Sequence, residues 1–195
     1  MIARGYLPSV ATHSTLFVAN HISWADIHAI NSVIPVRFVA KMEIKDWPVF
    51  GYLVKKSGTL FINRAHRKDA ARVVEVVTAS LGDGDNLCFF PKGTTTDGSE
   101  VLPFKSSIMQ AAINANAHIV PIAIRYRNPD GSTNTCAAYA GDTSLLESMS
   151  TLLKYPHPTV ELEFFAPITV LSRTRQDVAN EAFQTIHAHL HGEVG

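Results

Sequence analysis

A histidine and an aspartate stand five residues apart in the segment Asn-His-Ile-Ser-Trp-Ala-Asp, residues 20–26, directly after a short apolar run. A neutral imidazole held by a carboxylate can accept the proton of a hydroxyl group, because the carboxylate fixes the ring tautomer and stabilises the imidazolium that forms. His21 and Asp26 therefore favour general-base chemistry on a hydroxyl. Acyl transfer to an alcohol is the first hypothesis.

The spacing decides whether His21 and Asp26 can meet. On a continuous α-helix, residues five apart are separated by about 500° of rotation, which leaves their side chains roughly 140° apart. Contact therefore requires a change of chain direction between them. Ser23 predicts such a change, since Ser-Trp-Ala-Asp has the capping-box pattern in which the serine begins a helix and the aspartate reaches back to the first amides. On this heptad alone, a capping Asp26 and an ordinary turn histidine explain the residues equally well.

Short apolar runs alternate with amphipathic stretches along most of the chain. The runs with the length and composition of strands are residues 15–19, 36–40, 59–62, 86–90, 119–125, 135–140 and 160–165. The stretches expected to be helical are residues 24–32, 70–77, 105–116, 143–153 and 179–186. This alternation predicts an α/β fold with a mixed, largely parallel sheet flanked by helices, in a single domain over residues 1–195. The turn sequence Asn-Pro-Asp-Gly at 128–131 predicts an antiparallel pair of strands around it.

Three further segments contain or follow strand-like runs, where an α/β sheet collects its ligands. Residues 58–64 read Gly-Thr-Leu-Phe-Ile-Asn-Arg and place Arg64 at the end of a strand, where a guanidinium can hold a phosphate. A later strand leads into a loop in which Gly93 allows close backbone approach and Thr94 offers a hydroxyl. Residues 120–122, Val-Pro-Ile, suit either the wall of an acyl-chain site or a plain core strand.

Taken in order, these segments resemble the glycerolipid acyltransferase family, whose best-known members are 1-acylglycerol-3-phosphate O-acyltransferases (lysophosphatidic acid acyltransferases). The family carries the motifs N-H-x-x-x-x-D, G-x-x-F-I-x-R and F-P-E-G-T, followed by an apolar strand of V-P-I type. The matching residues of this chain are 20–26, 58–64, 90–94 and 120–122. Four motifs in the same order are far more specific than any one of them. The resemblance covers about residues 12–170 and implies a glycerol-3-phosphate acyltransferase-like α/β fold.

The resemblance also implies a mechanism. His21 would be the general base that takes the proton of the acceptor hydroxyl, and Asp26 would orient it. The hydroxyl would attack the thioester of acyl-CoA or acyl carrier protein, with no acyl-enzyme, cofactor or metal ion. The acceptor would be a lysophospholipid, first of all 1-acylglycerol-3-phosphate, which becomes phosphatidic acid. The residues implied in substrate binding are Asn20, Lys41, Arg64, Lys92, Gly93 and Thr94.

One residue departs from the family pattern. Lys92 stands where the family motif has Glu, and an ammonium cannot accept the hydrogen bonds that a carboxylate accepts. Impaired activity, altered acceptor choice, or a lipid-binding homologue without the chemistry are therefore alternatives. Thr95 follows the motif where many lysophosphatidic acid acyltransferases have Arg. The longer pattern, F-P-E-G-T-T-S-D-G in the family, is similar to bacterial members that include lyso-ornithine lipid O-acyltransferases.

Charge patterning points to an anionic partner. Lys and Arg together equal Asp and Glu, at 17 each, but residues 37–72 carry nine basic residues against three acids. Beside apolar and aromatic residues, a local excess of six positive charges suits a membrane surface or a phosphorylated ligand, although a solvated basic face is an alternative. Nucleic acid is not expected, because the chain has no basic arm, zinc-ligand spacing or RNA-binding signature.

Targeting signals are absent from the given sequence. It contains no apolar run of about 18 residues and no signal peptide. Two cysteines are too few for a disulfide framework, and Cys88 lies within an apolar run, where burial is its expected role. The chain is expected at the cytoplasmic face of the cell membrane, either peripheral or anchored by an upstream segment.

Overall fold

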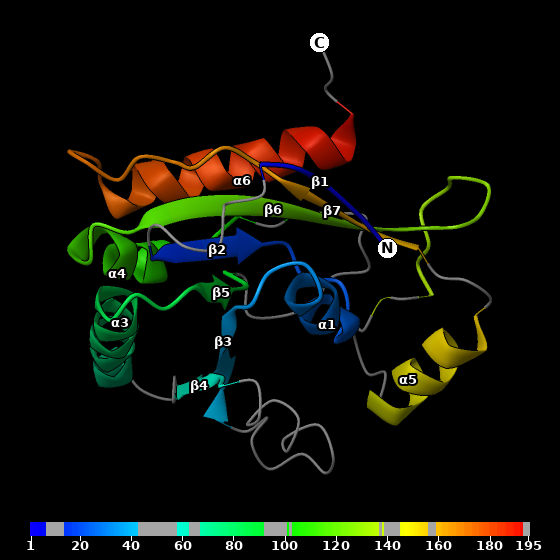
Figure 1. Ribbon diagram of the computed structural model, residues 1–195, viewed down its shortest axis with the longest axis horizontal. Coiled ribbons are helices and arrows are strands. Elements are labelled where there is room, and N and C mark those ends of the chain that lie inside the picture. Colours follow the sequence, from blue (N-terminus) through cyan, green and yellow to red (C-terminus); the bar gives the residue numbers. More distant parts are fainter. Residues whose placement is uncertain are drawn as a thin grey trace.

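The computed structural model describes residues 1–6, 14–42, 58–62, 67–91, 101, 103–136, 138, 145–155 and 159–192. Within this part of the chain, seven strands form one sheet in the order β1-β7-β6-β2-β5-β3-β4 (Figure 1). The strands are β1 (Ile2–Gly5), β2 (Thr15–Ala19), β3 (Arg37–Lys41), β4 (Leu60–Ile62), β5 (Leu87–Phe89), β6 (His118–Arg127) and β7 (Thr159–Phe164). The helices are α1 (Ala25–Asn31), α3 (Arg67–Gly82), the 3-10 turn η2 (Ser106–Ile108), α4 (Met109–Asn114), α5 (Leu145–Lys154) and α6 (Arg175–His191).

The sheet is mixed and largely parallel, which confirms the predicted fold class. Strand β2 lies in the middle and pairs in parallel with β6 on one side and β5 on the other, with Leu16 opposite Ile119 and Leu87. Strands β3 and β4 continue the parallel part. Strand β7 is antiparallel to β6, and β1 is parallel to β7. The five strands from β2 to β6 therefore all have their carboxyl ends at one edge of the sheet. This is the edge where α/β folds bind ligands.

Both faces of β2 are buried, because its residues 16–19 alternate between two apolar clusters. Leu16 and Val18 point to the face covered by α3, α4 and α6, whose apolar side chains belong to the same cluster. Phe17 and Ala19 point to the opposite face, where they pack with α1. Burial on both sides explains why the strand reads as a continuous apolar run instead of an alternating one.

Six of the seven predicted strands form, and the prediction for residues 135–140 is wrong in its described part. Thr135, Cys136 and Ala138 lie outside any strand. The predicted turn does form, since the Gly131 N–H donates to the Asn128 carbonyl over 2.9 Å. Across this turn, Thr133 forms only an isolated antiparallel bridge with Arg127, and the antiparallel strand neighbour of β6 is β7.

Strand β1 was not predicted from the sequence. Its four residues are mostly exposed, so they lack the apolar pattern of a strand, and pairing with β7 holds them in the sheet. Gly5 has a φ of +84°, and a Cβ at this position would lie 2.1 Å from the Phe164 carbonyl oxygen. Only glycine fits this approach. The predicted helix at 105–116 also differs, because it divides into η2 and the short α4.

Candidate active site

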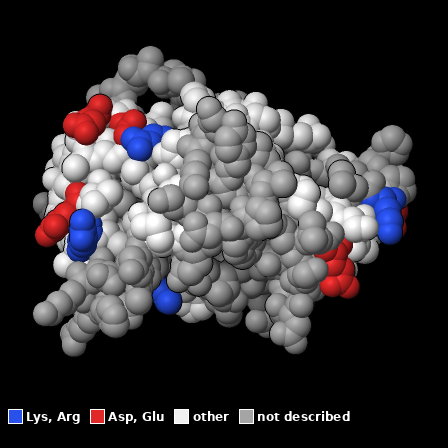
Figure 2. Space-filling view, turned by 90° about the horizontal axis from the view of Figure 1, so that it is seen from below, with Lys and Arg blue, Asp and Glu red and all other residues white. Residues whose placement is uncertain are grey.

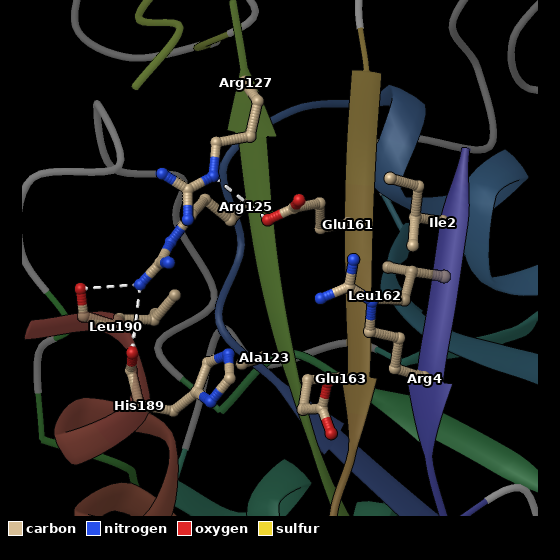
Figure 3. A pocket seen from close by; sticks show the side chains of 10 residues that line it. All are labelled: Ile2, Arg4, Ala123, Arg125, Arg127, Glu161, Leu162, Glu163, His189 and Leu190. Carbon is tan, nitrogen blue, oxygen red and sulfur yellow. Dashed lines mark hydrogen bonds and ion pairs between the residues drawn. The ribbon is translucent and has the colours of Figure 1, made fainter. Parts of the chain in front are cut away.

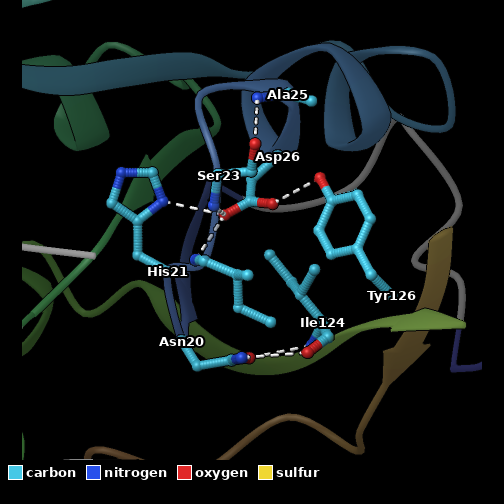
Figure 4. A network of polar contacts seen from close by, with 8 residues as sticks. Asn20, His21, Ser23, Ala25, Asp26, Ile124 and Tyr126 are labelled. Atoms are coloured by element: carbon cyan, nitrogen blue, oxygen red, sulfur yellow. Dashed lines mark hydrogen bonds and ion pairs between the residues drawn. The ribbon is translucent and has the colours of Figure 1, made fainter. Parts of the chain in front are cut away.

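The motif at residues 20–26 occupies the connection between β2 and α1, at the carboxyl end of the central strand (Figure 4). The chain turns here as predicted. The Ser23 Oγ accepts a hydrogen bond from the Ala25 N–H over 3.3 Å, and the Asp26 N–H donates to the Ser23 carbonyl over 3.1 Å. Helix α1 begins at Ala25, one residue later than the predicted range of 24–32. The turn reverses the chain direction, so that His21 and Asp26 meet.

Asp26 is fully buried and receives four hydrogen bonds. Its Oδ2 accepts from the Ile22 N–H over 2.8 Å, from the Ser23 N–H over 3.0 Å, and from His21 Nδ1 over 2.8 Å. Its Oδ1 accepts from the Tyr126 hydroxyl over 2.8 Å. Three of these partners, the Ile22 and Ser23 amides and the Tyr126 hydroxyl, donate whatever the tautomer of His21, which is the environment of an ionised carboxylate.

His21 is oriented for use as a base. Because the ionised carboxylate can only accept, the Nδ1 of His21 carries the proton and the Nε2 carries the free lone pair. Figure 4 shows the other edge of the ring directed away from Asp26. The side chain is 19% exposed, so a substrate hydroxyl can reach it. This is the geometry of a histidine base with a buried orienting carboxylate.

The ring of Phe90 supports the imidazole of His21. The two rings stack with centroids 3.9 Å apart and planes inclined by 11°. Phe90 in turn stacks on Phe38 of β3, with centroids 6.0 Å apart. Phe90 is the first residue of the F-P-K-G-T segment, so the motifs at 20–26 and 90–94 meet at least at this pair of rings.

The hydrogen bonds of Asn20 differ from those expected of a substrate-binding residue. Its Nδ2 donates to the Ile124 carbonyl over 2.9 Å, and its Oδ1 accepts from the Ile124 N–H over 2.8 Å. The backbone ladder between β2 and β6 reaches Ala19 opposite Ile122, and this side chain extends it by one more pair. Asn20 is buried. These contacts support a structural role at the start of the turn instead of substrate binding.

Tyr126 was missed by the sequence analysis. It lies on β6, is 4% exposed, and donates its hydroxyl to Asp26. Burial, followed by the negative charge of Asp26, raises the pKa of this phenol, so it stays protonated and acts as a donor. The available signal was a tyrosine between two arginines at the end of an apolar run, since a buried hydroxyl requires a partner. The sequence did not show which residue that partner is.

Of the other predicted binding residues, the structure describes the backbone of Lys41. Arg64, Lys92, Gly93 and Thr94 lie outside the described residues. Lys41 is the last residue of β3 and so lies at the same edge of the sheet as His21.

Of the nine basic residues in 37–72, the structure describes the side chains of Arg37 and Arg72. Arg37, one of the nine basic residues in 37–72, forms an ion pair with Asp85 and donates through Nε to the Gly58 carbonyl over 2.8 Å. In Figure 2, the described acidic and basic side chains on the visible face are scattered and mixed in sign. Most of the basic segment lies outside the described residues. Among the described helices, none is both long and apolar enough to cross a bilayer.

A charged pocket of about 140 Å³ lies on the other face of the sheet (Figure 3). Its charged and polar lining residues are Arg4, Arg125, Arg127, Glu161, Glu163 and His189. Arg127 Nε donates to Glu161 over 3.0 Å, and Arg125 donates to the backbone carbonyls of His189 and Leu190 over 3.0 and 2.7 Å. The two hydrogen bonds of Arg125 attach the last turn of α6 to β6. Side chains at 125 and 127 point away from that of Tyr126, so the pocket is separate from the site at His21.

Cys88 is not a candidate nucleophile. It is fully buried, as predicted, and burial together with the nearby charge of Asp26 raises the pKa of its thiol. A protonated thiol without solvent access is inert. The fold and the site together define an α/β protein in which a buried carboxylate orients a histidine base at the ligand-binding edge of a parallel sheet.

Comparison with known proteins gives the family. The family profile described as Acyltransferase matches residues 4–125, which include all four motifs. The chain is 36% identical over 177 residues to the lyso-ornithine lipid O-acyltransferase of Pseudomonas aeruginosa, with 91% of this chain and 68% of that protein covered. It is 38% identical over 152 residues to the 1-acyl-sn-glycerol-3-phosphate acyltransferase of Neisseria gonorrhoeae, with 78% and 59% covered. This chain belongs to the acyltransferase family.

A solved structure agrees on the fold. The 1-acyl-sn-glycerophosphate (LPA) acyltransferase PlsC from Thermotoga maritima matches with a TM-score of 0.66, over 97% of this chain and 70% of that chain. The sequence identity is 18%, so this likeness concerns the architecture alone.

Proposed function

We propose that this protein transfers a fatty acyl group from acyl-CoA or acyl carrier protein to the free hydroxyl of a lysophospholipid. The observation that carries the proposal is the hydrogen bond between His21 Nδ1 and Asp26 Oδ2, 2.8 Å long, at the carboxyl end of β2. It leaves Nε2 as the basic atom of a partly exposed ring. Membership of the acyltransferase family supports the type of reaction.

The proposed reaction needs only one base. The Nε2 of His21 accepts the proton of the acceptor hydroxyl while the hydroxyl oxygen attacks the thioester carbonyl carbon. The tetrahedral intermediate collapses by breaking the carbon–sulfur bond, and the imidazolium gives its proton to the departing thiolate. The products are an ester and a free thiol, and His21 ends neutral. Asp26 stabilises the imidazolium throughout.

Two acceptors are candidates. The first is 1-acylglycerol-3-phosphate, which would give phosphatidic acid, and the similarity to the Neisseria gonorrhoeae protein supports it. The second is lyso-ornithine lipid. It is supported by the similarity to the Pseudomonas aeruginosa protein over 91% of this chain and by Thr95 after the third motif. We further propose that the reaction takes place at the cytoplasmic face of the membrane, where residues 37–72 would meet anionic lipid.

Release of free CoA from oleoyl-CoA tests the reaction, with lysophosphatidic acid and lyso-ornithine lipid supplied separately. The wild-type chain should turn over one acceptor, and His21→Ala and Asp26→Asn should each lower kcat by about 10²- to 10⁴-fold. His118→Ala is the matched control, because His118 is exposed at the opposite, amino end of β6. Equal activity in wild type and His21→Ala would overturn the role of His21.

A substitution at Lys92 tests whether this protein is an active enzyme or an impaired homologue. The substitution Lys92→Glu restores the carboxylate of the family motif. A large gain in turnover would show that the base and the acceptor site are intact and that Lys92 limits the wild-type rate. Turnover by the wild type that falls in Lys92→Glu would instead show that Lys92 serves this chain's own acceptor.

A further inference from the structure

Strand β6 holds both ends of the motif at residues 20–26 (Figure 4). Asn20, the first residue of the motif, is bound on both sides of its amide by the backbone of Ile124. Asp26, the last residue, is bound by the Tyr126 hydroxyl. Ile124 and Tyr126 are two residues apart on one strand, about 7 Å along it. The turn that carries His21 is therefore clamped at both ends by a strand about a hundred positions further along the chain.

The two oxygens of Asp26 have different kinds of partners. All three donors to Oδ2 come from the turn itself, at His21, Ile22 and Ser23. The donor to Oδ1 comes from another part of the sheet, at Tyr126. Donors within the turn move with Asp26, whereas the phenol is fixed in the packed core of β6. The Tyr126 hydroxyl thus ties the orientation of the carboxylate to strand β6 of the sheet.

We propose that Tyr126 is a positioning residue, which fixes the carboxylate of Asp26 and thereby sets how strongly that carboxylate holds the protonated form of His21. The hydroxyl draws part of the negative charge toward Oδ1. Less charge remains on Oδ2 to stabilise the imidazolium, so the base is released at lower pH. Burial and Asp26 keep the phenol protonated, which excludes Tyr126 itself as a base. This inference deepens the proposed function and rests on it for its kinetic consequences.

The substitution Tyr126→Phe removes the donor and keeps the ring. We expect kcat to fall by about tenfold or more, as for a lost hydrogen bond to a charged group, with KM values changed by less than about twofold. The acid limb of the kcat/KM profile should move to higher pH by about half a unit or more, because a carboxylate that lacks one donor holds the imidazolium more tightly.

The matched control is Tyr155→Phe. The Tyr155 hydroxyl donates to Asn128 Oδ1 over 2.6 Å, so the control also removes one phenol hydrogen bond, but not one to Asp26. It should leave kcat and the pH profile unchanged. If Tyr126→Phe loses only thermal stability and keeps the wild-type kcat and pH profile, the hydroxyl has a structural role alone and the proposal is overturned.

A second measurement separates this proposal from the proposed function. The titration midpoint of the His21 ring, followed by NMR in the free protein, needs no substrate. It should rise in Tyr126→Phe and not in Tyr155→Phe. A wild type without turnover on either acceptor, but with this rise, would contradict the proposed function and retain the role of Tyr126. An unchanged midpoint would contradict the role of Tyr126, whatever the turnover.

Discussion

Phe90 and His21 stack face to face, with ring centroids 3.9 Å apart and planes inclined by 11°. His21 follows β2 and Phe90 follows β5, two parallel strands that lie side by side in the sheet. The stack therefore joins two motifs that are about 70 positions apart in the sequence. The hydrogen bond to Asp26 holds one edge of the imidazole, and the ring of Phe90 holds its plane. Together they determine where Nε2 points.

Replacing Phe90 by leucine should disturb the imidazole more than the fold. Loss of a stacked aromatic pair costs about 0.5–1.5 kcal/mol, so we expect kcat/KM to fall by roughly 2- to 10-fold in Phe90→Leu. Phe104→Leu is the control, because Phe104 is also buried but packs edge-on against Phe183 on the other face. Steady-state kinetics and thermal unfolding of both variants check this. Equal loss of kcat/KM in the two variants would contradict a specific role for the stack.

The substitution Asn20→Ala should destabilise the protein. It removes both partners of the buried Ile124 backbone at the end of the β2–β6 ladder. Leaving such groups unpaired costs about 1–3 kcal/mol, measured as the free energy of unfolding by chemical denaturation. Asn114→Ala, at an exposed position of α4, should change this energy by less than about 0.5 kcal/mol. If Asn20→Ala is as stable as wild type but raises KM for the acceptor, Asn20 binds substrate after all.

Gly5→Ala should detach β1 from the sheet. Gly5 and Gly131 have nearly the same positive φ, at +84° and +85°. A Cβ on Gly5 would lie 2.1 Å from the Phe164 carbonyl oxygen, whereas a Cβ on Gly131 would meet nothing within 4 Å. Gly131→Ala should therefore cost only the strain of the left-handed backbone, about 1 kcal/mol. Gly5→Ala should cost more and also expose the amides of residues 2–5, measured by hydrogen exchange. Similar losses and unchanged exchange would show that β1 moves aside at little cost.

Acid should weaken the attachment of the last turn of α6. Burial, followed by the charge of Arg125, lowers the pKa of His189 below its ordinary value of 6.5. Below about pH 6.5, the unfolded chain therefore binds more protons at this residue than the folded chain does. The free energy of unfolding must then fall as the pH is lowered through this range.

His189→Gln tests this assignment. Its free energy of unfolding should fall less between pH 7.5 and 5.5 than that of the wild type, because the titrating group is gone. For Gln184→Ala, which changes an exposed residue without a titratable group on the same helix, the free energy of unfolding should fall as it does for the wild type. Chemical denaturation at both pH values makes the comparison, and parallel decreases in wild type and His189→Gln would contradict the role of His189.

Much of the fold could be predicted because its signals are local. Six of the strands are short apolar runs, and burial on both faces makes such runs visible without knowledge of their neighbours. The turn between His21 and Asp26 could also be predicted, since Ser23 and Asp26 lie within one capping pattern. The order of four motifs indicated the family.

Other features depended on which elements become neighbours. The chain itself determined the strands, the helices and the pairing of a histidine with an aspartate, because these follow from residues within a few positions of one another. The tertiary structure alone decided that β7 pairs with β6 and that β1 joins the edge of the sheet. It also placed Tyr126 on Asp26 and Ile124 on Asn20, across 100 and 104 positions. Such contacts depend on the packing of the whole sheet, which no local pattern of residues encodes.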